Sequence, residues 1–382
     1  MAYSASLHVA STHPGAGAWL NEGQTLESQG DPASLQQAVK AYDHALALLR
    51  GEDPRFWKAR AVVWMNRGNA LQRVGGAAAV SDAIRSYDQA IAHFEKLLGE
   101  LPEAGGGGRY ATLASRLSAP SELDAGSLNA LGAAWMNRGV ALQQARDADS
   151  VRAAIDSHEN ALAALSCLPI DADLAFRRNL AATWLNLADA LLDAPSRDGQ
   201  PRAAEAARCA LQLVTPLVVS QPAFVDLDLK ARRALVMALG QQLHHFVLPP
   251  EVTSAMASEV SDAIDDGMAL ARQWTPTVGD VFLALEFRLY CLGCQFYRLY
   301  QPQFLGEFVR ENVTGGDGTL RQDFVLVAQE SLNSAQTEIG RSPVRPANEA
   351  DALKQVETLR ELRGTLHWLE EQLSLGVASS PS

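Results

Sequence analysis

Trp, Gly and Leu recur at helical spacing in the first half of the chain. In four segments a Trp is followed by Gly or Ala four residues later and by Leu seven residues later. A second motif begins 19 residues after each Trp and places Ala, an aromatic or small residue, and Ala at the same offsets. Offsets of 0, 4 and 7 share one face of a helix, so each pair of motifs predicts two amphipathic helices. The first motifs begin at Trp19, Trp64, Trp135 and Trp184, and the second motifs begin at Ala38, Ala83, Ala154 and Ala203.

Turn-forming residues separate the two helices of each predicted pair. They are Gly30-Asp31-Pro32, Gly75-Gly76, Asp147 to Asp149, and Pro195 to Pro201. Gly and Pro interrupt helices, so each pair is expected to fold back as a hairpin. Small residues let the two helices approach closely, and a single hairpin cannot bury its apolar face alone. The pattern therefore predicts an all-α solenoid of stacked helical hairpins.

The third copy begins late. Successive Trp residues are 45, 71 and 49 residues apart, and the excess falls between about 99 and 126, where Gly105 to Gly108 are four consecutive glycines. Such a run opposes regular structure. We interpret this stretch as a long loop with a short amphipathic piece over 110–117. A passive surface insertion is the favoured interpretation, and a lid over a groove is the alternative.

Helical periodicity continues in the second half, although the motif fades. Prolines delimit helices expected near 223–246, 251–274, 278–300, 318–340 and 348–375. We expect degenerate helical repeats over 218–375, with the last helix as a charged cap. The four repeats then span 17–217, and 1–16 and 376–382 are expected to be flexible ends.

Composition narrows the class of protein. The 382 residues carry 32 Lys and Arg against 44 Asp and Glu, a net charge of −12. This balance disfavours nucleic acid as the partner, because phosphate binding depends on clustered cations. No apolar run reaches the length of a membrane span, and the N-terminus lacks the pattern of a signal peptide. Four cysteines are too few for a disulfide scaffold, so a cytoplasmic protein with reduced thiols is expected.

The paired motifs resemble the tetratricopeptide repeat. The match covers roughly 17–215 in four copies, but these copies are longer than the family's repeat of about 34 residues. The resemblance implies a right-handed solenoid whose first helices line a concave groove for peptides or partner proteins. Members that clamp C-terminal carboxylates have Lys one residue after the Trp position. That place holds Leu20, Met65, Met136 and Leu185 here, so this type of ligand is not expected.

A polar stripe lies opposite the Trp face of each first helix. Its offsets from the Trp are 2, 5 and 9. Its members are Asn21, Gln24 and Ser28; Asn66, Asn69 and Arg73; Asn137, Val140 and Gln144; and Asn186, Asp189 and Asp193. Asn occupies offset 2 in every copy, although Glu, Lys or Gln would be better helix formers at a merely solvated site. An amide both donates and accepts hydrogen bonds, so a ladder of amides suits an extended backbone.

The resemblance implies the same role for the four offset-2 residues, because Asn at this place grips the ligand main chain in peptide-binding members. The alternative is that each Asn bonds a neighbouring helix end or loop. Our candidate binding residues are Asn21, Asn66, Asn69, Arg73, Asn137, Gln144, Asn186 and Asp189.

Other chemistry is less well supported by the sequence. Cys291 and Cys294 lack further ligands at zinc spacing and are expected to be buried thiols. His244 and His245 are expected at a helix end, and Asp262, Asp265 and Asp266 on a solvated face. No phosphate loop, nucleophile elbow or HExxH motif is present, and no cofactor or metal is expected.

Two function classes remain open. The favoured one is an interaction scaffold that binds a protein or peptide along the Asn-lined groove. The alternative is a ligand-sensing or catalytic protein with a pocket in the C-terminal half, near Cys291, Cys294 and His244. The sequence leaves the partner and the oligomeric state open.

Overall fold

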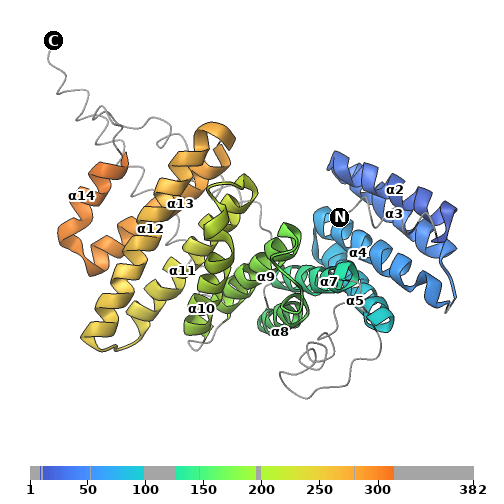
Figure 1. Ribbon diagram of the computed structural model, residues 1–382, viewed down its shortest axis with the longest axis horizontal. Coiled ribbons are helices and arrows are strands. Elements are labelled where there is room, and N and C mark those ends of the chain that lie inside the picture. Colours follow the sequence, from blue (N-terminus) through green and yellow to red (C-terminus); the bar gives the residue numbers. More distant parts are fainter. Residues whose placement is uncertain are drawn as a thin grey trace, which may run out of the picture. The chain divides into compact units, whose positions relative to one another are not determined.

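The computed structural model describes residues 9, 12–51, 53–98, 125–145, 147–194, 199–278 and 280–313. Every regular element in these residues is helical, so the fold is all-α (Figure 1). The chain divides into two compact units, Met1–Val214 and Thr215–Ser382. None of the described helices is long and apolar enough to cross a membrane.

The first unit contains the four predicted hairpins. They are α2 (Pro14–Gln29) with α3 (Pro32–Leu48), α4 (Trp57–Val74) with α5 (Ala77–Leu98), α7 (Ala125–Gln143) with α8 (Ala148–Leu165), and α9 (Leu174–Asp193) with α10 (Gly199–Val214). Each helix packs most closely on its hairpin partner, and each second helix also packs on the first helix of the next hairpin. Direct contacts also link α2 to α4, α4 to α7 and α7 to α9, so the first helices lie next to one another.

Local sequence sets the helix ends. At the turn between α2 and α3, Gly30 has a φ of 78°, a backbone angle that residues with a Cβ rarely adopt. Asp31 then caps α3, because its Oδ1 accepts hydrogen bonds from the Ala33 and Ser34 amides at 3.0 Å. Asp147 caps α8 in the same way through Ser150. The predicted turns at these two places are therefore confirmed, with Asp149 in the first turn of α8.

A small residue lets the two helices of each hairpin approach. The ring of Tyr42 lies directly on Gly23 in the first hairpin, and a Cβ built on Gly68 would lie 2.6 Å from a ring carbon of Tyr87 in the second. His158 lies on Gly139 in the third. All three rings are fully buried. The fourth hairpin replaces the pair by two small residues, Ala188 and Ala207, which are both buried.

The second unit is a run of helices that pack in sequence order. After two short 3-10 turns, Thr215–Leu217 and Pro222–Phe224, come α11 (Val225–His245), α12 (Pro250–Val278), α13 (Asp280–Tyr300) and α14 (Pro302–Val313). Each packs on the next, and α11 also contacts α13.

Three of the helices predicted in this unit are confirmed, and two boundaries are corrected. The helix expected to stop before Pro276 continues through it to Val278, because a proline removes one backbone donor without ending a helix near its terminus. The predicted helices leave 301–317 between them, but Pro302 begins α14, since the first helical turn needs no amide donor there. The helices expected at 318–340 and 348–375 lie outside the described residues, as does the loop expected at 99–126 except for its last two residues, which belong to α7.

Candidate functional site

The polar stripe predicted from the sequence lies along the neighbouring first helices α2, α4, α7 and α9. We call it the ladder face and define it by the residues at offsets 2, 5 and 9 from each Trp. None of these side chains is buried, and all four at offset 9 are exposed, namely Ser28, Arg73, Gln144 and Asp193. The Gly or Ala at offset 4 is buried against the second helix in every copy. The stripe therefore faces away from the hairpin interiors, as predicted.

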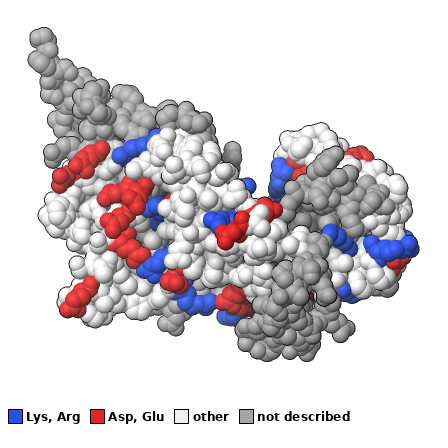
Figure 2. All heavy atoms as spheres, viewed as in Figure 1, with Lys and Arg blue, Asp and Glu red and all other residues white. Residues whose placement is uncertain are grey.

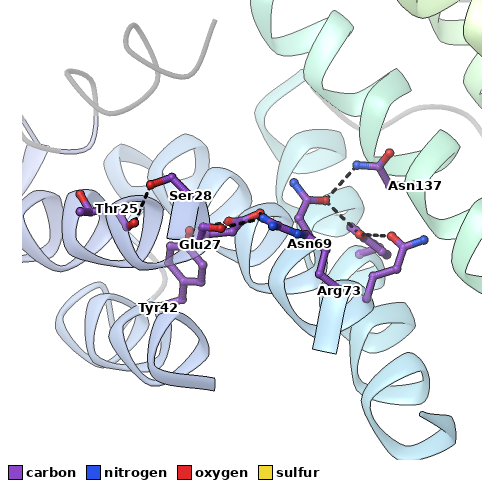
Figure 3. A network of polar contacts seen from close by, with 9 residues as sticks. Thr25, Glu27, Ser28, Tyr42, Asn69, Arg73 and Asn137 are labelled. Carbon is purple, nitrogen blue, oxygen red and sulfur yellow. Dashed lines mark hydrogen bonds and ion pairs between the residues drawn. The ribbon is translucent and has the colours of Figure 1, made fainter. Parts of the chain in front are cut away.

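Two of the predicted binding residues bond to each other. The Nδ2 of Asn137 on α7 donates to the Oδ1 of Asn69 on α4 at 3.0 Å (Figure 3). The Tyr87 hydroxyl lies 2.9 Å from the same Oδ1 and 2.9 Å from the Oε1 of Gln72. At these two positions the amides thus stabilise contacts between neighbouring first helices, within the array.

Arg73 bridges α4 to α2, the first helices of the first two hairpins. Its Nη1 donates to the backbone oxygen of Glu27 at 2.8 Å and lies 3.5 Å from the Glu27 carboxylate (Figure 3). Tyr42 donates its hydroxyl proton to the same carboxylate at 2.9 Å. Burial, followed by the charge of Glu27, raises the pKa of Tyr42 far above its ordinary value, so the phenol stays protonated.

A third bridge joins α7 to α9. The Nδ2 of Asn179 donates to the Oδ1 of buried Asn129 at 2.9 Å. Every boundary between neighbouring first helices in this unit therefore carries a polar side-chain bridge. Such bonds fix the spacing of the helices whose outer sides form the ladder face.

The other offset-2 residues behave differently. Asn21 is exposed and Asn66 and Asn186 are half-buried, and their side chains make no hydrogen bond within the described part of the chain. The structure thus places one amide of this kind on each of α2, α4 and α9. Gln144 is exposed and Asp189 half-buried on the same face.

The role of Arg67 and Arg138 was not predicted from the sequence. Each guanidinium lies over the Trp of its own helix, at 5.5 Å for Trp64 and 5.6 Å for Trp135. Arg67 also donates to Ser86 at 2.8 Å and pairs with Asp43 of the preceding hairpin at 2.7 Å.

Arg138 makes the equivalent contacts one hairpin later, with Ser157 at 2.6 Å and with Asp88 at 2.7 Å. The signal in the sequence was Arg at offset 3 in two copies, each preceded by a hairpin with Asp at the same place in its second motif. The fourth copy has buried Leu187 at offset 3, and Arg202 of α10 pairs with Glu159 instead.

No protein-family model matches this chain, and no curated protein matches it. Among solved structures the chain is similar to a "Circular tandem repeat protein with novel repeat topology and enhanced subunit contact surfaces", with 13% identity and a TM-score of 0.35 over 98% of this chain and 86% of that one. The chain is a helical repeat protein. Its four motif pairs form four successive hairpins.

Cys294 of the second unit lies on α13, and His244 and His245 lie at the end of α11. Burial raises the pKa of the Cys294 thiol to about 11, so it stays protonated at neutral pH. His244 and His245 end α11 with their rings in edge contact at 4.9 Å. No group of three or more His, Cys, Asp or Glu among the described residues could hold a metal ion.

Acidic side chains gather over α12 and α14 in Figure 2. Burial, then the charges of Asp262, Asp266 and Glu311, raises the pKa of Asp265. Arg232 of α11 donates to Asp266 of this cluster at 3.0 Å and to buried Asp228 at 2.6 Å. Arg232 therefore ties the cluster to the interior of the unit.

Proposed function

We propose that the first unit is a scaffold similar to tetratricopeptide repeats, which binds an extended segment of a partner protein along the ladder face. The observation that carries this proposal is the set of three offset-2 amides, on Asn21, Asn66 and Asn186, that have no hydrogen-bond partner within the described structure. Each can donate to one main-chain carbonyl and accept from one main-chain amide.

The neighbouring arrangement of the first helices supports the proposal. An extended chain has donors and acceptors that alternate along its length, and it can cross several helices side by side. Packed helices are about 8–10 Å apart, and an extended residue advances about 3.3 Å, so successive helices meet the chain every third residue. The polar bridges between α2, α4, α7 and α9 keep this spacing fixed, which reduces the entropy lost on binding.

Free thiols favour the cytoplasm as the place where this scaffold works. No disulfide joins the four cysteines Cys167, Cys209, Cys291 and Cys294, all of which lie in the described part of the chain. Reduced thiols persist in a reducing compartment, and secreted proteins usually pair them.

The test is a selection of random linear heptapeptides displayed on phage, with the full chain as bait. The affinity of each recovered peptide is then measured for the wild type, for the triple variant N21A/N66A/N186A, and for N160A as a matched control. Asn160 lies on the second helix α8, away from the ladder face. Three lost hydrogen bonds of about 0.5–1.5 kcal/mol each predict a weakening of at least about tenfold in the triple variant.

N160A should bind the recovered peptides like the wild type. Peptides that bind the triple variant as tightly as the wild type would contradict the proposal. A selection that recovers no peptide at all would contradict it as well.

A further inference from the structure

The four side chains at offset 9 form a row at one edge of the ladder face. They lie at the C-terminal ends of the four first helices and all are exposed. Ser28 and Gln144 are neutral, whereas Arg73 is a cation and Asp193 an anion. The row therefore carries opposite charges on two helices, α4 and α9, that are separated by one helix.

Arg73 keeps donors available to a ligand. Only its Nη1 is engaged, with Glu27, so Nε and Nη2 make no hydrogen bond within the described residues. The side chain is 46% exposed, and its ion pair with Glu27 is long at 3.5 Å. A carboxylate needs two parallel donors from a guanidinium, which this arrangement leaves in place.

The negative charge of Asp193 lies at a helix position where the helix dipole disfavours it. It is the last residue of α9, at the end where the helix dipole is negative, so a carboxylate there lowers helix stability. It makes no hydrogen bond or ion pair with any described residue. Asp189 lies one turn earlier on the same helix and adds negative charge at this end of the face. An anion at a position that helix electrostatics disfavour is a candidate for a role outside the fold.

The distance between the two charges sets the length of the ligand. Because α4, α7 and α9 are successive neighbours, Arg73 and Asp193 are about 20 Å apart. An extended chain covers this distance in about six residues. We infer that the ladder face selects an extended peptide segment with one acidic and one basic side chain about six residues apart, the acidic one at Arg73 and the basic one at Asp193. This inference rests on the proposed function, because Asn66 and Asn186 would hold the main chain between the two charges.

The experiment uses labelled peptides of defined charge and the full chain. The probes are Asp-Ser-Thr-Val-Ser-Thr-Lys, the same peptide with Asp and Lys exchanged, and a neutral version with Asn and Gln at the ends. Affinity is measured by fluorescence polarisation. One of the two charged orders should bind roughly threefold to thirtyfold tighter than the neutral peptide, as expected for two exposed ion pairs, and salt should reduce the difference.

Variants of the protein test which residue recognises each charged end of the peptide. R73Q should remove the preference for the acidic end, and D193N should remove the preference for the basic end. The exchanged variant R73E/D193K should prefer the opposite order of charges. This reversal of preference cannot arise from general loss of folding, since the variant gains affinity for one peptide while losing it for the other.

The outcomes separate this inference from the proposed function. Equal binding of all three peptides that still depends on Asn66 and Asn186 would overturn the charge selection and leave the scaffold standing. Absence of binding for all three peptides would overturn the charge selection, whereas the phage selection tests the scaffold itself. A preference for one order that survives in R73E/D193K would show that other residues set it, and would also overturn the inference.

Discussion

Asn69 shows how one polar side chain can serve the fold and the ladder face together. The Tyr87 hydroxyl has one proton but lies 2.9 Å from two amide oxygens, those of Asn69 and Gln72. The Asn69 oxygen already accepts from Asn137. Turning the Gln72 amide so that its nitrogen donates to the Tyr87 oxygen satisfies all the contacts. Asn69 then directs its own amide protons away from this network.

His158 replaces the tyrosine of the first two hairpins and makes stability depend on pH. Burial lowers the pKa of His158 from 6.5 to about 4, so the ring is neutral in the folded protein at pH 7. Its Nε2 lies 3.1 Å from the Oε1 of Gln143, to which the neutral ring donates. Between pH 6.5 and 4 the unfolded chain binds a proton that the folded chain does not, so stability falls as pH falls through this window.

The substitution H158Y should remove this dependence. In the first two hairpins a tyrosine packs on the glycine at offset 4, and its hydroxyl reaches the residue eight positions after the Trp. Tyr42 thus reaches Glu27, and Tyr87 reaches Gln72. Between pH 7.5 and 4.5 the wild type should lose roughly 2–3 kcal/mol more free energy of unfolding than H158Y. Urea unfolding of both proteins at the two pH values measures the difference, since the contributions of other titrating groups cancel. Equal losses would show that the ring is solvated.

At the scale of the helix pair, the glycine at offset 4 sets how closely two helices approach. A Cβ on Gly68 would meet the Tyr87 ring at 2.6 Å, and the buried ring has little room to move. G68A should therefore lower the free energy of unfolding by about 1–3 kcal/mol. The matched control is G240A in α11, where nothing lies within 4 Å of the new Cβ.

G240A should stabilise the protein by up to about 1 kcal/mol, because Ala is the better helix former. Chemical denaturation of both variants measures whether each substitution lowers or raises the free energy of unfolding. If G68A were also stabilising, the hairpins would be packed on a different face from the one described.

Helices were predictable where a motif repeats, and less so where it does not. Four copies with one internal separation fix the phase of eight helices, so the first unit and its outward polar stripe followed from the sequence. In the second unit only prolines marked the boundaries, and a proline can begin or continue a helix as well as end one. Pro302 and Pro276 illustrate both cases.

The contacts between hairpins were not predictable in the same way. The Asn137 to Asn69 bond joins residues 68 positions apart across the long insertion, and no local pattern specifies such a pair. Whether an amide of the stripe bonds inside the array or faces outward depends on the spacing of neighbouring helices. The repeated Arg at offset 3 and Asp in the second motif did carry a signal, because they recur in register between successive copies.

At the scale of the whole chain, the first unit alone holds the proposed binding face. Its stability comes from each hairpin and from the contacts between neighbouring hairpins. These contacts include the ion pairs of Arg67 with Asp43 and of Arg138 with Asp88. The second unit has interior contacts of its own, among them buried Glu286, which accepts from Arg272 at 2.7 Å. Each unit thus has its own set of interior contacts, and the proposed binding face belongs to the first unit.

The most direct test of this binding face is to locate a bound peptide by photo-crosslinking. A peptide recovered by selection is made with a diazirine at its central residue, irradiated on the full chain, and mapped by mass spectrometry. We expect crosslinks on the outer sides of α4 and α7, including Val140 on α7 and Gln144 just after it, which lie midway along the ladder face. Crosslinks confined to the second helices α5 and α8, or to the second unit, would contradict it.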